Sequence, residues 1–267
     1  MARPSTTPSA FGTSLRTWRR RRGLSQMHLA YEAGTTPRHV SILETGRSRP
    51  GAEMVDRLAE ALHVPLRERN ELLRAAGLPP AYPEGGLDDA ALASVRDVVE
   101  QVMRRHHPYP SWCMGRGLRI LRSSPVAERL LPGMASMSAV ELVEMWFSPG
   151  PFREICENWA DVARTSLHLL RVENENAPHP DVAAALQRAQ DLAHRLPDPS
   201  APPDLPVVCP ILRIGEQRIR TVSTVMRFET ARAVEAAEMR IELLFPADAA
   251  GAAFFEAVAA TLPPGDG

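Results

Sequence analysis

Residues 24–46 read LSQMHLAYEAGTTPRHVSILETG, and this stretch decides how the N-terminal part of the chain folds. Leu29 and Ala33 are four residues apart, so they share one face of a short helix. Gly34 supplies the left-handed backbone conformation that ends a helix at little cost. The first half of the stretch therefore predicts a helix that stops at a tight turn.

The second half of the stretch predicts a new helix directly after that turn. Thr36 offers a hydroxyl that caps free backbone amides, and Pro37 has the fixed φ that suits the first helical position. The helix is expected to continue to about Glu44, with Val40 and Leu43 facing the core. The other faces then present Arg38, His39, Ser41 and Ile42.

Charge is distributed unevenly along the chain. Met1 to Pro50 contains nine Arg and two Glu, an excess of seven positive charges, whereas the whole chain carries −1, which leaves −8 for the remainder. A basic head on a mildly acidic body is typical of a nucleic-acid-binding domain joined to a domain of another kind. The run Arg19–Arg22 can be a phosphate-contacting surface or only a solvated helix face. We favour phosphate contact, because the run precedes the turn that leads to the next helix.

These residues resemble the helix-turn-helix of the XRE family, the Cro and phage-repressor type of DNA-binding domain. The resemblance covers roughly Phe11 to Ala76 and implies an all-α, five-helix, lambda-repressor-like domain. The implied helices are Phe11–Arg22, Ser25–Ala33, Thr36–Glu44, Ala52–Leu62 and Leu66–Ala76. The implied core residues are Leu15, Trp18, Val55, Leu58, Leu62, Leu72 and Leu73. One departure is Gly51, where a Ser is more usual as a helix cap.

The resemblance also implies which residues meet DNA. Gln26 matches the family's phosphate-contacting glutamine, and the guanidinium of Arg38 suits a bidentate contact with a guanine edge. Ser41 can reach a base or a phosphate, and His39 can touch a base or only the DNA backbone. The candidate DNA-binding residues are Arg19, Arg20, Ser25, Gln26, Thr36, Arg38, His39, Ser41, Arg47 and Arg49. The expected partner is a double-stranded DNA operator.

Length and composition predict two domains. The 267 residues suffice for two separate cores, and residues 77–86 (GLPPAYPEGG) contain three Pro and three Gly, which cannot continue a helix. We expect a DNA-binding domain over 1–76 with its helix-turn-helix core at 11–76, a linker over 77–86 and a second domain over 87–267. No apolar run matches a membrane span and no signal-peptide core is visible, so we expect a soluble, cytoplasmic protein.

The sequence offers no support for catalysis. Cys113, Cys156 and Cys209 lack the paired spacing of metal or redox sites and are interpreted as small buried or half-buried residues. The pair His106-His107 before Pro108 has no companion cluster and is interpreted as a helix end. Neither a phosphate-binding glycine loop nor a nucleophile with its base is found. We expect no enzymatic activity, no cofactor and no metal site.

The chain after Leu87 combines helix and strand patterns. Leu92, Val95, Val99 and Val102 form one narrow apolar stripe, which can pair with its copy in a dimer or pack on the domain's own sheet. Predicted strands are 109–114 and 118–122, which form a hairpin, then 207–214, 218–228 and 239–245. Predicted helices are 139–147, 159–172, 181–196 and a closing helix around Phe254, Phe255 and Val258. Together these predict an antiparallel sheet with helices packed on one side.

This arrangement resembles the MmyB-type ligand-binding domain, a PAS-like α+β domain often found behind an XRE domain. The resemblance is carried by Pro108-Tyr109-Pro110, NWADVAR at 158–164, TVSTV at 221–225 and LFPAD at 244–248. One departure is the segment 117–124, which lacks the Trp and Asn that the family usually carries there. The resemblance implies that the domain holds a small ligand.

Large apolar side chains are the candidate walls of such a ligand site, because they adapt around an apolar or fatty-acid-like molecule. The alternative is that they are ordinary core. Arg164 is the candidate partner of an acidic head group, and it can equally be a surface charge. The candidate ligand-binding residues are Trp112, Met114, Trp146, Phe147, Trp159, Arg164, Met226 and Phe228.

Two functional hypotheses follow. The first is a ligand-responsive transcription regulator that binds a two-fold symmetric operator as a homodimer and is controlled by a small apolar or amphipathic ligand in its C-terminal domain. The alternative is a DNA-tethered scaffold whose C-terminal domain binds another protein and no small ligand. An enzyme that carries a DNA-binding domain is a third and weaker option.

Overall fold

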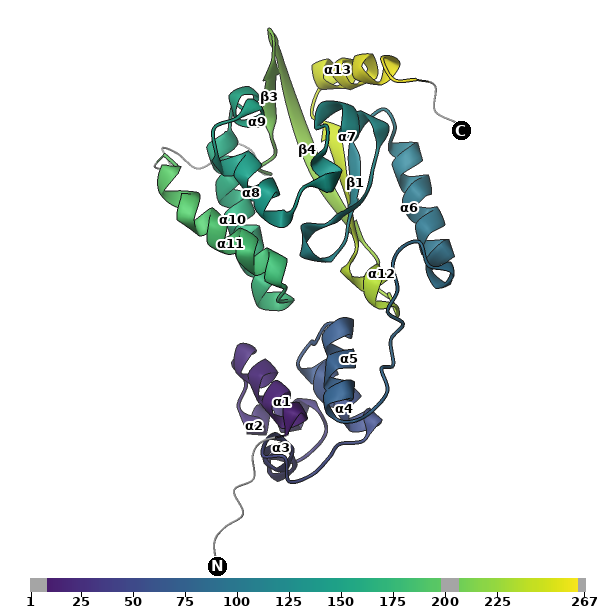
Figure 1. Cartoon of the computed structure of the whole chain (residues 1–267), viewed down its shortest axis with the longest axis vertical. Helices are drawn as coiled ribbons and strands as arrows, with labels where there is room; N and C mark the ends of the chain where they lie inside the picture. Colours follow the sequence, from purple (N-terminus) through teal and green to yellow (C-terminus); the bar gives the residue numbers. More distant parts are fainter. Residues whose placement is uncertain (1–8, 198–206, 264–267) are drawn as a thin grey trace, which may run out of the picture. The chain divides into compact units, whose positions relative to one another are not determined.

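The computed structural model describes residues 9–197 and 207–263, which form two compact units (Figure 1). The first unit contains the chain up to Gly85 together with Thr230–Ala237. The second contains Gly86–Glu229 and the chain from Glu238 onward. In the described ranges, no helix is both long enough and apolar enough to cross a membrane.

The chain up to Gly85 forms the predicted helices. They are α1 (Ala10–Arg21), α2 (Gln26–Glu32), α3 (Pro37–Glu44), α4 (Ala52–Ala61) and α5 (Leu66–Ala75), and each end lies within one residue of its prediction. Hydroxyl caps explain two of the sharp starts. Ser25 accepts a hydrogen bond from the His28 N–H at 3.1 Å, and Thr36 accepts one from the His39 N–H at 3.2 Å. Gly51, which begins α4, makes no side-chain cap.

The core between these helices contains the predicted apolar residues. Leu15, Trp18, Val55, Leu58, Leu62, Leu72 and Leu73 are all buried in one cluster with Val40 and Leu43. Gly12 allows α1 to approach α3 closely. A Cβ atom at position 12 would lie 2.6 Å from the Leu43 carbonyl oxygen and 2.7 Å from that of Glu44. The contact between α1 and α3 therefore depends on a residue without a side chain.

The predicted linker is fastened to α5 over residues 79–84, which we call the strap. Asn70 is fully buried and its Oδ1 accepts hydrogen bonds from the N–H groups of Ala81 at 3.0 Å and Tyr82 at 3.1 Å. Its Nδ2 donates to the Tyr82 carbonyl at 2.8 Å. One side chain thus supplies both donor and acceptor to the strap, which then follows a fixed path along α5.

The strap also binds the connection between the last two strands. The Val234 N–H donates to the Pro83 carbonyl at 3.0 Å, and Val234 is fully buried. This contact explains why Thr230–Ala237, which includes all of α12 (Val234–Glu238) except its last residue, belongs to the first unit.

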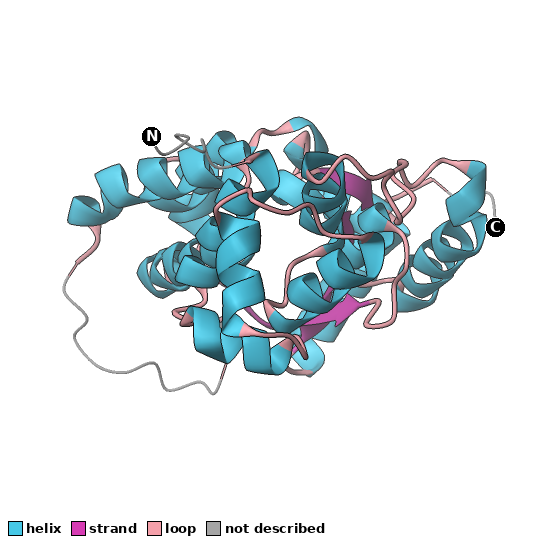
Figure 2. Ribbon diagram, turned by 90° about the horizontal axis from the view of Figure 1, so that it is seen from below, coloured by secondary structure: helices cyan, strands magenta, loops and turns pink. Residues whose placement is uncertain are grey.

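The second unit contains a five-stranded antiparallel sheet in the order β2-β1-β5-β4-β3. Figure 2 shows parts of its strands in magenta, behind the helices. The strands are β1 (Ser111–Met114), β2 (Ile120–Ser123), β3 (Ile211–Ile214), β4 (Gln217–Arg227) and β5 (Arg240–Pro246). The predicted antiparallel sheet and its first hairpin are confirmed.

Helices surround this sheet and form a separate bundle beside it. They are α6 (Ala93–His106), α7 (Pro125–Leu130), α8 (Ala139–Phe147), α9 (Pro151–Ile155), α10 (Trp159–Asn176), α11 (Pro180–Leu192) and α13 (Ala249–Ala260). Helices α8, α10 and α11 share a core that includes Phe147, Leu167 and Leu170. The sequence patterns predicted α6, α8, α10, α11 and α13 but not the short helices α7, α9 and α12.

The prediction that helices lie on one side of the sheet is wrong. Cys113 packs with Val99 of α6, whereas the next residue back, Trp112, packs with Ala127 of α7. Consecutive residues of a strand point to opposite faces, so α6 and α7 cover opposite faces. We call these the α6 face and the α7 face. The apolar stripe of α6 packs on the sheet of its own domain, which was one of its two predicted roles; the other was pairing with its copy in a dimer.

Candidate nucleic-acid interface and candidate ligand site

The turn between α2 and α3 has the geometry that the sequence predicts. Gly34 has a φ of +59°, and the Thr35 N–H donates to the Ala30 carbonyl at 2.8 Å. The Gly34 N–H donates to the Tyr31 carbonyl at 3.2 Å. These two bonds satisfy the last carbonyls of α2 and set the direction in which α3 leaves.

Helix α3 divides its side chains between the core and the surface as expected. Val40 and Leu43 are fully buried, and Arg38 is exposed. Ser41 and His39 are half-buried, and the His39 Nδ1 lies 2.9 Å from the Thr35 hydroxyl. The turn thus fixes the His39 ring, which leaves Arg38 as the long, unrestrained side chain at the start of α3.

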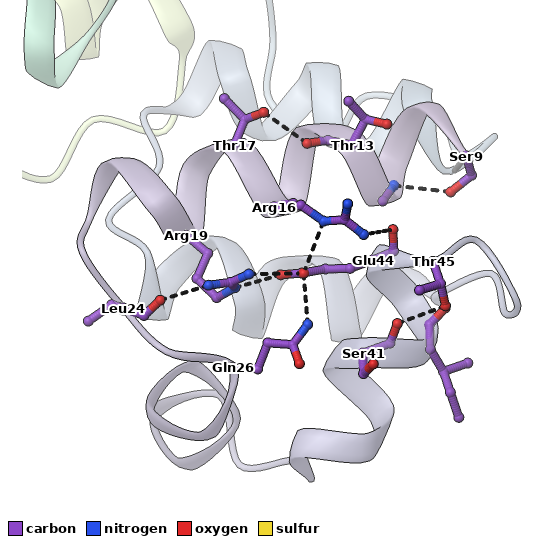
Figure 3. A network of polar contacts seen from close by, with 12 residues as sticks. Ser9, Thr13, Arg16, Thr17, Arg19, Leu24, Gln26, Ser41, Glu44 and Thr45 are labelled. Atoms are coloured by element: carbon purple, nitrogen blue, oxygen red, sulfur yellow. Dashed lines mark hydrogen bonds and ion pairs between the residues drawn. The ribbon is translucent and has the colours of Figure 1, made fainter. Parts of the chain in front are cut away.

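Glu44 at the end of α3 joins three helices through one buried carboxylate (Figure 3). Its oxygens accept hydrogen bonds from Arg19 at 2.6 and 3.0 Å, from Arg16 at 3.3 Å and from Gln26 at 2.9 Å. The Glu44 side chain is 1 % exposed. Because Arg16 and Arg19 belong to α1 and Gln26 to α2, this network fixes α3 against both helices. From the sequence, Glu44 was predicted only as the last residue of its helix and as one of two acidic residues in the basic segment.

The pKa of Glu44 reflects this environment. Burial by itself raises the pKa of the carboxyl group, but the hydrogen bonds from Arg19, Gln26 and Arg16 together with the charge of Arg19 outweigh it, so the pKa lies below its ordinary value. Glu44 is therefore ionised at neutral pH and holds its basic partners in place.

The arginine run Arg19–Arg22 has more than one role. Arg19, expected at the DNA, is held inside: it donates to Glu44 and to the Leu24 carbonyl, and its side chain is 12 % exposed. Arg22 donates to the carbonyls of Leu62 and His63 at the end of α4. Arg20 and Arg21 are exposed, and Arg21 lies over the Trp18 ring at 5.2 Å. Half of the run is thus structural, and we retain Arg20 but not Arg19 as a phosphate contact.

The remaining DNA candidates lie around the two short helices. Ser25 and Thr36 are exposed caps at the N-termini of α2 and α3. Gln26 is half-buried and committed through Nε2 to Glu44. Arg47 and Arg49 are exposed in the segment that follows α3.

The structure does not bring the ligand candidates together. Trp112 and Met114 share a cluster on the α7 face. Met226 pairs in register with Ile241, and Phe228 packs in the cluster of Ile241 and Val99, so both lie on the α6 face. The sheet therefore separates Trp112 and Met114 from Met226 and Phe228, so these four candidates do not line one common wall.

The other ligand candidates are engaged in local contacts. Phe147 is fully buried between α8, α10 and α11, and the Trp146 ring meets that of Phe152 at 4.3 Å. The Arg153 guanidinium lies 3.6 Å from the centre of the Trp159 ring. Arg164 donates to Asp161 at 2.8 Å and also to the Pro197 carbonyl. Arg164 is thus paired already, which argues against its expected role with an acidic head group.

The cysteines and the metal-ligating side chains of the described residues do not form a further candidate site. Cys113, Cys156 and Cys209 are buried and form no disulfide among the described residues, and burial raises the pKa of Cys156 to about 11. No cluster of metal-ligating side chains occurs among the residues that the structure describes.

Comparisons with known proteins point to the same two parts of the chain. A family model described as "MmyB-like transcription regulator ligand binding domain" matches residues 95–258, and one described as "Helix-turn-helix domain" matches residues 10–72. Among solved structures, the chain is similar to the clp gene regulator ClgR from Corynebacterium glutamicum. The identity is 24 %, the match covers 38 % of this chain and 93 % of that chain, and the TM-score is 0.23. No curated protein matches the chain significantly.

Proposed function

The chain belongs to the family defined by the MmyB-like transcription regulator ligand binding domain and is a DNA-binding transcription regulator, and from this premise we propose how it works. The helix-turn-helix binds a specific operator as part of a homodimer. A small apolar or amphipathic molecule in the second unit controls that binding.

One observation carries the DNA-binding half of the proposal. Glu44 fixes α3 against α1 and α2, while the opposite side of α3 presents Arg38 to solvent. A helix that is rigidly held and has an exposed arginine at its start is suited to insertion into the major groove, where a guanidinium recognises guanine.

Exposed arginines around α3 support a phosphate surface. Arg20, Arg47 and Arg49 are exposed, and no ion pair involves them among the described residues. Such side chains can neutralise phosphates without competition from nearby carboxylates. We therefore divide the contacts into Arg38 for base recognition and Arg20, Arg47 and Arg49 for the backbone.

The division predicts different losses for two variants. Arg38→Ala should cost about 1–3 kcal/mol on the specific site and little on random duplex, because a base contact disappears. Arg20→Ala should weaken both duplexes alike and lower the salt slope by about one. Fluorescence anisotropy over a salt series measures both quantities. Equal losses on specific and random DNA for Arg38→Ala would contradict the base-recognition role.

The homodimer is proposed from the size of the DNA-binding part. A single small domain has too little interface for tight, specific binding, and two copies read two half-sites one helical turn apart. Analytical ultracentrifugation of the whole chain with and without its operator tests this. A 1:1 complex with tight, specific binding would overturn it.

One observation supports the alternative function, in which the second unit binds another protein and no small ligand. Val222 and Phe245 are paired in register on the α6 face, Met226 lies on the same face of β4, and all three are partly exposed apolar side chains. Mass spectrometry of compounds that stay bound after desalting from a cell extract separates the two candidates. A retained small molecule supports ligand control, and none retained supports the scaffold.

A further inference from the structure

Three buried side-chain polar atoms in the sheet have no hydrogen-bond partner among the described residues. One, the Ser111 Oγ in β1, lies on the α6 face, because Ser111 pairs in register with Leu243. The other two are the indole Nε1 of Trp112 in β1 and the hydroxyl Oγ of Ser123 in β2. Trp112 is 8 % exposed. Buried donors without partners are costly, so each such group in a folded protein calls for an explanation.

The two groups come from directly opposed residues. Trp112 pairs with Ser123 across β1 and β2, and both side chains therefore project from the α7 face. The Ser124 N–H donates to the Ser111 carbonyl, so the adjacent pair of Trp112 and Ser123 is a non-hydrogen-bonded one. In such pairs the Cα atoms are about 4.5 Å apart and the side chains are close. The unsatisfied Trp112 and Ser123 atoms therefore come from neighbouring side chains on one face of the sheet.

The surroundings of this pair are apolar. Trp112 packs in a cluster with Met114, Ile120, Ala127, Leu131 and Met134. The short helical turn at Met134–Ser136, which lies between α7 and α8, contributes the half-buried Met134 to the cluster. An apolar molecule can therefore lie against this cluster, with thioether side chains that adapt to its shape.

The charges nearby disfavour an acidic ligand. Glu242 lies directly across from Trp112 on β5 and projects from the same face. Arg240 is shared between Glu242 at 3.4 Å and Glu173 at 3.2 Å, and Arg116 lies 3.5 Å from Glu238. Arg240 and Arg116 thus each already have a carboxylate partner, whereas Arg129 of α7 is exposed to solvent. A carboxylate ligand would therefore be buried near net negative charge, which is unfavourable.

We propose that Trp112 and Ser123 form the polar anchor of the ligand site and select a neutral molecule with an acceptor oxygen, such as a ketone, ester or lactone on an apolar body. This specifies the ligand class of the function proposed above and rests on it. The acceptor oxygen receives hydrogen bonds from the Trp112 Nε1–H and the Ser123 Oγ–H, and the apolar body contacts Met114, Ile120 and Met134.

The experiment compares two ten-carbon probes on the whole chain with ¹⁵N-labelled tryptophan. The probes are 2-decanone, which is neutral, and decanoate at pH 8, which is ionised. We expect 2-decanone to move the Trp112 indole N–H resonance in a saturable manner. Decanoate should need at least about ten-fold higher concentration, since its charge must be desolvated.

Two variants and a matched control locate the effect. Trp112→Phe and Ser123→Ala should each weaken 2-decanone binding by about two- to ten-fold, the usual value of one hydrogen bond. Trp18→Phe removes an indole N–H from the core of the first unit and should leave binding unchanged. The remaining indole resonances show whether each variant is folded.

Three results would overturn the proposal: an unmoved Trp112 resonance, decanoate binding as tight as that of 2-decanone, or equal losses in Trp112→Phe and Trp18→Phe. Failure of the proposed function is recognised separately. It would appear as absence of specific DNA binding, which these spectra do not measure.

Discussion

At the scale of single residues, Glu44 connects the most parts of the DNA-binding unit. Its carboxylate receives hydrogen bonds from α1 and α2, and its own backbone carbonyl accepts one from Arg16 at 3.0 Å. The substitution Glu44→Gln removes the charge and keeps the shape of the side chain, so it isolates the contribution of the charge to stability.

Glu44→Gln should lower the free energy of unfolding by about 3–5 kcal/mol, because Arg16 and Arg19 lose a buried counter-charge. Because the folded pKa of Glu44 is lowered, its contribution is complete above the unfolded value of about 4.3 and is lost as the pH falls through the folded pKa. The variant should therefore show a shallower loss of stability at acid pH. Urea unfolding between pH 3 and 7 measures both effects.

The control for this prediction is Glu71→Gln. Glu71 is exposed and pairs only with Arg74, so its loss should cost less than about 1 kcal/mol. If Glu44→Gln and Glu71→Gln had the same stability and the same acid profile, Glu44 would have no special role in joining the helices.

Gly12 is the second residue on which this unit depends. Gly12→Ala should destabilise by about 1–3 kcal/mol, because the new Cβ meets backbone atoms of α3 that cannot move aside. Gly86→Ala is the control, since a Cβ there has no neighbour within 4 Å. Thermal unfolding followed by circular dichroism compares them. An unchanged midpoint for Gly12→Ala would show that α1 and α3 can separate without cost.

These residues differ in how far the sequence predicts their roles. Val40 and Leu43 follow from helical spacing alone. Glu44 has a signal that was not used: it is an acidic residue beside buried positions in a strongly basic segment, which indicates a buried partner for arginine. Gly12 has no such signal, because close approach of two helices depends on tertiary packing.

At the scale of elements, the strap is the least expected feature. Three prolines in residues 77–86 predict that the helix ends, but they do not predict that the following chain is bound. The binding comes from Asn70, an amide inside α5 whose donor and acceptor match the backbone of an extended segment.

Asn70→Ala should release the strap and cost about 2–3 kcal/mol, since the N–H groups of Ala81 and Tyr82 lose a buried acceptor. Hydrogen exchange of residues 79–84, read by mass spectrometry, should become faster in this variant. Glu84→Gln removes the ion pair of the strap with Arg74 but keeps a side-chain oxygen that can accept from the Asn70 Nδ2, so it should have a smaller effect. Equal exchange in wild type and Asn70→Ala would mean that the strap is held by other contacts.

The sheet shows what sequence patterns do not predict, namely which side chains of different strands share a face. Alternation of apolar residues located β5 and the β1–β2 hairpin, but a period of two does not tell which face of one strand meets which face of another. Met226 and Trp112 were therefore both named as candidate walls of one ligand site, although they project from opposite faces of the sheet. The short helices α7, α9 and α12 span only one or two turns, too few for a helical period to emerge.

At the scale of the whole molecule, the charge distribution and the two units agree. The basic excess lies in the unit that holds the helix-turn-helix, and the mildly acidic remainder forms mainly the sheet unit. Thr230–Ala237, between β4 and β5, belongs with the DNA-binding unit through Val234 and the strap. Two segments therefore connect the units: the linker, and the β4–β5 connection, which leaves the sheet, joins the first unit and returns.

The central claim is that the whole chain recognises a specific operator. The most direct measurement is selection of bound fragments from the genomic DNA of its source, followed by sequencing. We predict one enriched motif made of two inverted half-sites about one helical turn apart, lost in Arg38→Ala. Enrichment of no motif above random sequence, or the same motif with Arg38→Ala, would contradict the account.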